Sequence, residues 1–141
     1  MDVPERITYT ARVTSSGGRA GHAISDAGSL DVQLASPAHA GEGPGATPEE
    51  LFAAAWSACF NSSVLEAARE AGVDCSGATV TVSLGLGPHQ DSAAVTARIE
   101  VSVPGLDLPT VQDLADRAHQ LCAYSKATRG NVPAEVRAVE R

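Results

Sequence analysis

The segment TPEELFAAAWSACFN, residues 47–61, decides the fold, because it predicts a helix that cannot face water on any side. Thr47 suits an N-cap, Pro48 fits the first helical position, and two glutamates follow where the helix dipole is positive. Small and apolar residues come next, and the helical pattern continues to Ala71, before the typical helix stop Gly72. We therefore expect a long central helix over residues 48–71, buried by the rest of the fold.

Alternating apolar and polar residues predict strands before this helix. The alternation is clearest over residues 6–14, and weaker strands are expected at about 19–25 and 30–34, joined by short turns. Short turns between consecutive strands favour an antiparallel meander. A segment rich in Gly, Pro and Ala, residues 36–46, then leads to the helix. Its simpler interpretation is a surface connector, and the alternative is a hinge or lid.

The second half of the chain predicts a β-hairpin, a second helix and a last strand. The hairpin strands lie at about 79–86 and 95–103, the helix at about 109–123, and the last strand at about 135–139. The polar stretch AYSKATRGN, residues 123–131, is expected to be irregular. This order predicts an α+β fold in one domain, residues 1–141. Because one small domain offers little to cover the central helix, we expect a homodimer.

Charge and composition exclude several classes of protein. The net charge is −7, with only 10 Lys and Arg residues and no basic run, so nothing favours nucleic-acid binding. No apolar segment approaches the roughly 20 residues that span a bilayer, and the N-terminus lacks the pattern of a signal peptide. Three cysteines without CxxC, and four histidines without ligand spacing, predict no metal site. We expect a cytoplasmic protein with reduced thiols.

Cys59 is the first candidate for chemistry, because it lies within the apolar helix, one turn after Trp56. The alternative is that Cys59 is a small buried hydrophobic residue, and the same alternative applies to Cys122 at the inner edge of the second helix. Two cysteines on the two main helices, facing one core, favour a redox pair. Cys75, in a helix-to-strand turn, is interpreted as incidental.

A reactive thiol works as a thiolate, so a cation beside Cys59 would help it. Lowering a pKa by one unit takes about 1.4 kcal/mol. A guanidinium at about 4 Å, at an effective dielectric constant near 20, supplies roughly 4 kcal/mol before its own desolvation. Arg19, directly after Gly17 and Gly18, is the candidate, and a plain turn residue is the alternative.

Glu49 is the candidate partner that would hold this arginine by a bidentate pair, and a simple helix-start charge is its alternative. Glu49 and Cys59 are ten residues apart, which is about 15 Å along a straight helix. Glu49 therefore reaches Cys59 only through the arginine, through a break in the helix, or across a dimer interface.

Three motifs, GGRAGHA, TPEELFAAAWSACF and LCAYSKATRGN, resemble in order and spacing those of the organic hydroperoxide resistance (Ohr) proteins. These belong to the broader family of osmotically induced protein C (OsmC), and the third motif looks more like the Ohr branch. The resemblance covers essentially the whole chain. It implies a thiol peroxidase with the OsmC-like fold, working as an intertwined homodimer. The peroxidatic cysteine falls on Cys59, the resolving cysteine on Cys122, and the arginine and glutamate on Arg19 and Glu49.

The resemblance also implies the substrate and the source of electrons. It implies an organic hydroperoxide as substrate, no bound metal, haem or flavin, and recycling by a dithiol, typically dihydrolipoamide on a lipoylated protein. The aromatic residues around Cys59 suit an alkyl or fatty-acid hydroperoxide, with plain core packing as the alternative. These pocket candidates are Phe52, Trp56 and Phe60.

The chain departs from the family pattern at three places. Ala123 stands where the family usually has Pro, Thr47 where it often has Asn, and Ala55-Trp56 where it has Gly-Tyr. None of these changes removes a reacting group. Two other functions stay open: an OsmC-type peroxidase with another peroxide preference, and a redox-sensing or ligand-binding module that oxidises once without turning over.

Overall fold

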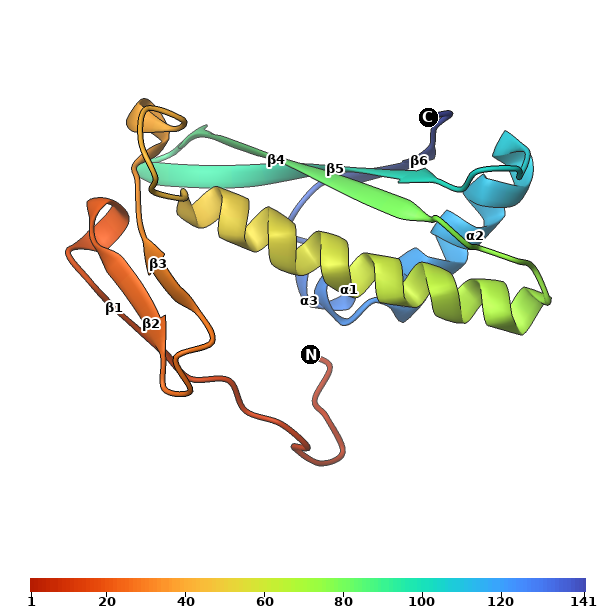
Figure 1. Cartoon of the computed structure of the whole chain (residues 1–141), viewed down its shortest axis with the longest axis horizontal. Coiled ribbons are helices and arrows are strands. Elements are labelled where there is room, and N and C mark those ends of the chain that lie inside the picture. The colour runs from red at the N-terminus through yellow and green to blue at the C-terminus, as the bar shows by residue number, and fades with distance from the viewer. The chain divides into compact units, whose positions relative to one another are not determined.

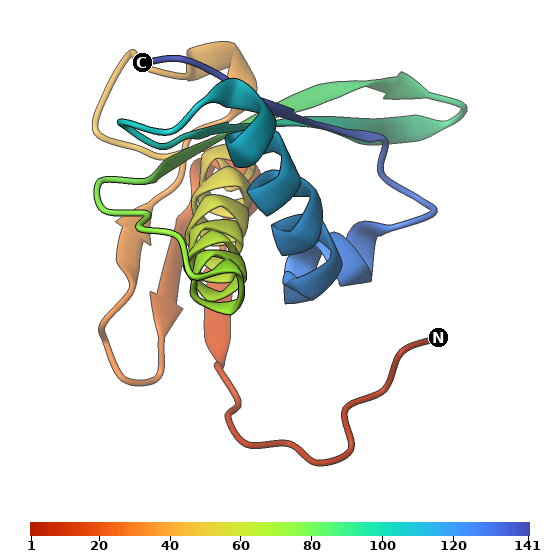
Figure 2. The same cartoon turned by 90° about the vertical axis from the view of Figure 1, so that its right-hand side faces the viewer.

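The long helix α1 spans Pro48–Ala71, the bounds that the sequence predicts, and runs without a break (Figure 1, Figure 2). Its start is a capping box. The Thr47 hydroxyl accepts a hydrogen bond from the Glu50 N–H at 3.1 Å, and the Glu50 carboxylate accepts one from the Thr47 N–H at 2.6 Å. The helix boundary is therefore set by local side chains, as its sequence indicates.

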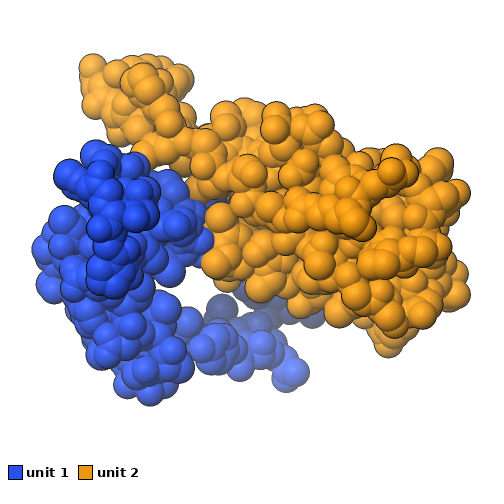
Figure 3. Space-filling model, turned by 45° about the horizontal axis from the view of Figure 1, so that its top comes forward, with its two compact units in different colours: residues 1–52 blue, residues 53–141 orange.

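The computed structural model describes all 141 residues, which form two compact units, residues 1–52 (unit 1) and 53–141 (unit 2) (Figure 3). Helix α1 begins in unit 1 and continues through unit 2. Each unit has its own three-stranded sheet. No helix combines the length and the hydropathy needed to cross a bilayer.

The sheet of unit 1 is the predicted antiparallel meander. Its strands are β1 (Val13–Ser16), β2 (His22–Ser25) and β3 (Asp31–Gln33). A 3₁₀ turn, η1 (Gly18–Ala20), separates β1 from β2, and a second, η2 (Pro37–His39), lies in the loop before α1. A parallel bridge between Leu34 and Ala46 closes this loop.

Two predicted strand boundaries in unit 1 are wrong. Residues 6–12 form no strand, although they alternate, because β2 pairs only as far as Val13 and no other strand of the chain pairs with them. Ile7 and Tyr9 are consequently exposed. The strand expected from Arg19 begins instead at His22, since Gly18–Ala20 takes a 3₁₀ turn.

The sheet of unit 2 contains the predicted hairpin and the last strand. Strands β4 (Thr79–His89) and β5 (Ser92–Ser102) pair antiparallel, and β6 (Ala134–Ala138) joins β5 in parallel. The hairpin is longer than predicted, because Gly87 and Pro88 continue β4. A proline is tolerated there because β4 is an edge strand, whose outer N–H groups need no partner within the sheet.

Helices α2 (Leu108–Leu121) and α3 (Ala123–Thr128) follow the hairpin. Asp107 caps α2 by accepting a hydrogen bond from the Thr110 N–H at 3.1 Å. The prediction that residues 123–131 are irregular is wrong, since α3 occupies the first six. Six residues are less than two helical turns, so α3 is too short for an apolar period to reveal it.

In unit 2, α1 and α2 lie against one face of the sheet (Figure 1, Figure 2). Alternate residues of β5, including Ile99 and Val101, are fully buried on this face. The core cluster comprises Trp56, Phe60, Val64, Ala67, Ala68, Cys75, Ala97, Ile99, Val101, Val103, Val111, Leu114, Ala115, Ala118 and Cys122. The architecture is therefore α+β, as predicted, and this core holds both candidate reactive cysteines, Cys122 inside it and Cys59 packed against it.

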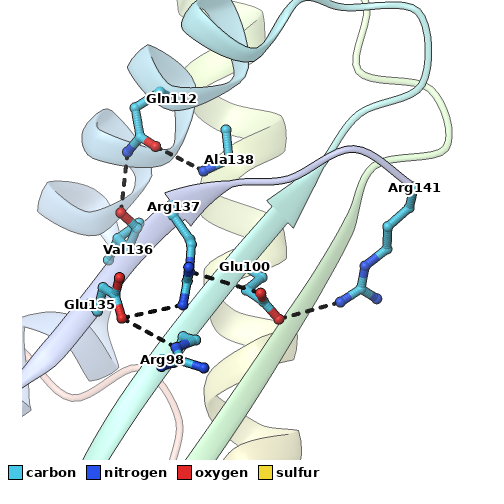
Figure 4. Close-up of polar contacts among 8 residues, drawn as sticks. All are labelled: Arg98, Glu100, Gln112, Glu135, Val136, Arg137, Ala138 and Arg141. Atoms are coloured by element: carbon cyan, nitrogen blue, oxygen red, sulfur yellow. Dashed lines mark hydrogen bonds and ion pairs between the residues drawn. The ribbon is translucent and has the colours of Figure 1, made fainter.

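The other residues of β5 and β6 carry a ladder of charges (Figure 4). Arg98 pairs with Glu135 at 3.2 Å, and Glu100 lies between Arg137 and Arg141 at 3.9 and 3.5 Å. The side chain of Gln112, on α2, covers the free edge of β6: it donates to the Val136 carbonyl at 3.3 Å and accepts from the Ala138 N–H at 2.8 Å. This edge is thus protected from pairing with another strand.

Candidate functional site

Cys59 and Cys122 lie side by side in unit 2. Cys122 is the single residue between α2 and α3. Its N–H donates to the Ala118 carbonyl at 2.8 Å at the end of α2, and its carbonyl accepts from the Lys126 N–H at 2.9 Å at the start of α3. Cys59 is half-buried in α1, whereas Cys122 is fully buried.

The two sulfur atoms are 3.4 Å apart, and both thiols are free. A disulfide bond is about 2.05 Å long, so the sulfurs need to move only roughly 1.4 Å closer to form one. The arrangement can therefore pass from two thiols to a disulfide with a small local movement.

The surroundings of Cys59 act on its thiol in opposite directions. Burial raises the pKa of Cys59, whereas hydrogen bonds from the backbone amides of Tyr124 and Ala123 lower it. These amides begin α3, directly after Cys122. Within this chain burial prevails, so the pKa of the Cys59 thiol is above its ordinary value. A peroxidatic role would need a further source of positive charge at the sulfur.

Arg19 and Glu49 form an ion pair within unit 1, between Arg19 Nη1 and Glu49 Oε1. Arg19 lies on η1 rather than on the predicted strand, and Gly17 and Gly18 before it have φ values of 73° and 59°, a left-handed conformation that favours glycine. The other carboxylate oxygen, Glu49 Oε2, is buried and has no hydrogen-bond partner. The four predicted catalytic residues thus form two pairs, one in each unit.

The three predicted pocket aromatics differ in exposure. Trp56 and Phe60 expose no surface and belong to the core of unit 2, which agrees with their core-packing alternative. Phe52 is 36% exposed. The pocket role therefore stays a prediction, with Phe52 the aromatic residue that an incoming molecule can reach in this structure.

Two residues that contact these aromatics were missed by sequence reasoning. The Trp56 indole N–H donates to the hydroxyl of Ser125 at 3.1 Å, and both residues are fully buried. The His119 ring lies 6.2 Å from the Phe60 ring, between centroids, and its Nδ1 is buried without a hydrogen-bond partner. Burial and the nearby Arg129 lower the pKa of His119, which favours the neutral ring. The available signal was spacing, since both residues lie three positions from Cys122.

Cys75 takes no part in the contact between Cys59 and Cys122. It is buried, and burial together with Asp74 raises the pKa of its thiol, which disfavours the reactive thiolate. It lines an open groove of about 670 Å³ between the second half of α1 and residues 73–78. None of the predicted catalytic or pocket residues lines this groove. The chain contains no group of three or more His, Cys, Asp or Glu side chains that could hold a metal ion.

Comparison with known proteins places this geometry in a family. Residues 41–137 match the family model described as OsmC-like protein. The chain is 38% identical, over 135 residues, to the organic hydroperoxide resistance protein of Xanthomonas axonopodis pv. citri, with 94% of this chain and 95% of that protein covered. The chain belongs to the OsmC/Ohr family. Within that family it is also 40% identical, over 126 residues, to the organic hydroperoxide resistance protein OhrB of Bacillus subtilis, with 88% and 93% covered.

Solved structures of Ohr proteins have the same fold. The crystal structure of OhrB of Bacillus subtilis superposes with a TM-score of 0.88 at 34% identity and covers 94% of this chain and 100% of that one. A putative organic hydroperoxide resistance protein of Vibrio cholerae, with captopril bound in one of its active sites, also gives 0.88, at 33% identity and with 98% and 96% covered. The resemblance that the three motifs indicated, and its Ohr branch, are confirmed.

Proposed function

We propose that this Ohr family member is a cysteine-based peroxidase that reduces organic hydroperoxides to alcohols. The observation that carries the proposal is the 3.4 Å separation of the Cys59 and Cys122 sulfurs at the core of unit 2, with Cys122 inside it and Cys59 packed against it. Two free thiols at this distance suit a reaction that alternates between a dithiol and a disulfide. The names of the relatives, organic hydroperoxide resistance proteins, supply the substrate class.

The proposed cycle has three balanced steps. The Cys59 thiolate attacks one oxygen of the O–O bond, which breaks. With one proton taken up, the alcohol leaves and Cys59 becomes a sulfenic acid, so sulfur is oxidised and the peroxide is reduced. The Cys122 thiol then displaces water from the sulfenic acid and forms the Cys59–Cys122 disulfide. An external dithiol reopens this disulfide by exchange and is itself oxidised to a disulfide.

In this proposal Arg19 supplies the positive charge that the half-buried Cys59 thiol needs. The guanidinium would stabilise the thiolate and the negative charge that develops on the peroxide oxygens. Glu49 would fix the guanidinium, in the ion pair described above. Phe52, and the aromatic core around Trp56 and Phe60, would provide the apolar surroundings that favour an alkyl or fatty-acid hydroperoxide.

We also propose that the 141 residues act as one domain within an intertwined homodimer. Three features of the single chain support a second copy: β4 pairs on one side only, residues 6–12 alternate but belong to no strand, and apolar residues of α1, including Leu65, are exposed. A second chain can satisfy all three at once. Light scattering should give twice 14.4 kDa, and a monomer would contradict this.

The remaining partners follow from the same cycle. The expected reductant is dihydrolipoamide, free or on a lipoylated protein, because a paired dithiol closes its own ring when it reduces a disulfide. The protein would need no resident metal or organic cofactor. The reducing cytoplasm is the expected compartment, since the resting state requires both thiols free.

One experiment tests the peroxidase and its electron source together. Reduced protein is mixed with tert-butyl hydroperoxide and dihydrolipoamide, and peroxide loss is followed for the natural chain, Cys59→Ser and Cys75→Ser. Repeated turnover in the natural chain and in Cys75→Ser, but not in Cys59→Ser, is expected. A parallel run with hydrogen peroxide should be slower, and an equal or faster rate would favour the OsmC-type peroxide preference.

A redox sensor is the second candidate function. The observation that favours it is the same pair of free thiols, 3.4 Å apart, because a single oxidation can join them in a disulfide. A sensor would consume one equivalent of peroxide per chain and then stop, with a Cys59–Cys122 disulfide that the dithiol does not reopen. Sustained consumption excludes this alternative.

A further inference from the structure

A hydrogen bond between two fully buried side chains joins α1 to α3 in unit 2. The Trp56 indole N–H donates to the Ser125 hydroxyl at 3.1 Å, and neither residue has exposed surface. A buried polar contact of this kind is costly to break and holds its two elements in a fixed relation.

The contact is placed symmetrically with respect to the two cysteines. Trp56 lies three residues before Cys59 on α1, and Ser125 lies three residues after Cys122, at the end of the first turn of α3. The same two segments are therefore joined twice, about one helical turn apart: once by the sulfur–sulfur contact and once by this hydrogen bond.

Helix α3 has little else in its own sequence to fix it. It contains six residues, and of these only Ser125 is buried. Cys122 belongs to the same short segment, because its carbonyl accepts the Lys126 N–H in the first turn. Whatever holds Ser125 therefore also helps to hold Cys122 from the α3 side, while the Ala118 carbonyl holds it from the α2 side.

The position of the Cys122 sulfur matters because the Cys59 sulfenic acid must react with it before a second peroxide arrives. Once Cys59 is a sulfenic acid, two reactions compete for it. The Cys122 thiol can displace water and form the disulfide, or a second hydroperoxide can transfer an oxygen, giving the sulfinic acid and another alcohol. The sulfinic acid is not reopened by a dithiol, so a Cys122 thiol that stays beside Cys59 protects the protein.

We propose that Trp56 and Ser125 are positioning residues for disulfide formation, which hold the Cys122 thiol against Cys59 so that the sulfenic acid is captured before a second peroxide reaches it. This inference rests on the proposed peroxidase cycle. It gives Trp56, which stands where the family has Tyr, a role in the second chemical step besides its proposed place in the apolar surroundings of the substrate.

The test separates the two chemical steps in single turnover. Ser125→Ala removes the acceptor and Trp56→Phe removes the donor while keeping an aromatic ring. Ser102→Ala, at another buried serine on β5, is the matched control. Quenched samples are resolved by mass into sulfenic acid, disulfide and sulfinic acid. Trp56 is the only tryptophan, so its fluorescence also follows both steps in Ser125→Ala.

The first step should be unchanged in Ser125→Ala and in Ser102→Ala, because neither serine belongs to the proposed substrate surroundings. Disulfide formation should slow about fivefold in Ser125→Ala and in Trp56→Phe, the factor that one neutral hydrogen bond supplies. The sulfinic acid fraction at high peroxide should rise by a similar factor. The double variant should be no slower than the slower single variant, because both changes remove the same contact.

Disulfide formation at the natural rate in Ser125→Ala would overturn the proposal, whether or not Trp56→Phe folds. Equal slowing in Ser102→Ala would also overturn it, since the effect would then be general loosening of the core. If the natural chain itself makes no sulfenic acid with a hydroperoxide, the proposed function fails first and this inference fails with it.

Discussion

Two glutamates of helix α1, one near each end, pair with arginines from other elements, and the two pairs differ in how completely the carboxylate is used. At the C-terminal end, Arg117 on α2 holds Glu70 with two hydrogen bonds, Nε to Oε2 at 2.8 Å and Nη2 to Oε1 at 3.2 Å. At the N-terminal end, Arg19 contacts only one oxygen of Glu49, and the other oxygen is buried without a partner.

We propose from this difference that the two pairs serve different purposes. Both oxygens of Glu70 are satisfied, and the pair links two helices, α1 and α2, that share a core. Glu49 is less exposed than Glu70, 15% against 41%, yet it leaves one oxygen unsatisfied, which costs stability. Such a cost is typical of a site shaped for function rather than for folding, and it leaves guanidinium N–H groups of Arg19 available for another acceptor.

The largest expected effect comes from Arg19→Ala. The substitution removes the positive charge that is proposed to stabilise the Cys59 thiolate and the peroxide oxygens. The pKa of Cys59 should therefore rise, and its oxidation by a hydroperoxide should slow about 100-fold. The rate is measured by stopped flow and the pKa from the pH dependence of alkylation. Arg12→Ala, at another exposed ion pair of unit 1, should leave both unchanged. Equal rates for Arg19→Ala and the natural chain would mean that the Arg19–Glu49 pair has no role in the reaction of Cys59.

Glu49→Gln should have a smaller effect of the same kind. The amide keeps the shape of the carboxylate but loses its charge, so Arg19 keeps its own charge and loses its anchor. A tenfold slower oxidation of Cys59 is expected, since a hydrogen bond to a charged group contributes about 1.5 kcal/mol. The measurement is the same stopped-flow rate.

Glu50→Gln is the matched control, because it removes the same charge from the same turn of α1. Glu50 serves the capping box with Thr47 and not the arginine. Its loss should lower stability by up to about 1 kcal/mol without changing the rate. If the two variants slow oxidation equally, the effect belongs to the charge of the helix start and not to the pair.

The sequence predicted the elements whose pattern is local and missed those that depend on a partner. Helix α1 has its capping box and its glycine stop within its own sequence, and its bounds are as predicted. Residues 6–12 carry the alternation of a strand, but a strand needs a neighbour along its length, and of these residues only Arg12 has one, the Asp26 N–H. The prediction missed helix α3 for the opposite reason. Its six residues show no helical period in the sequence, and a tertiary contact at Ser125 holds them.

The same distinction applies to the candidate site. Residue patterns raised Cys59, Cys122, Arg19 and Glu49 as candidates, and the motif resemblance implied a role for each, since each lies in a stretch that the family shares. It did not identify Ser125 or His119, whose contacts run between helices far apart in sequence. Nor did it give the unsatisfied oxygen of Glu49, which depends on how the first turn of α1 is buried.

The smallest expected effect is on the structural pair, in Arg117→Ala. Arg117 lowers the pKa of Glu70, so the pair stabilises the folded chain where the carboxylate is ionised. This contribution is present above the ordinary pKa of a glutamate, about 4.3, and disappears as the pH falls through the lower folded value. The urea midpoints of Arg117→Ala and the natural chain should therefore differ slightly at neutral pH and converge in acid, while Cys59 oxidation stays unchanged. Midpoints that stay equally far apart down to pH 3 would mean that Arg117 acts through packing of its side chain. In that case the Arg117–Glu70 pair could no longer be contrasted with the Arg19–Glu49 pair as an ion pair that serves folding.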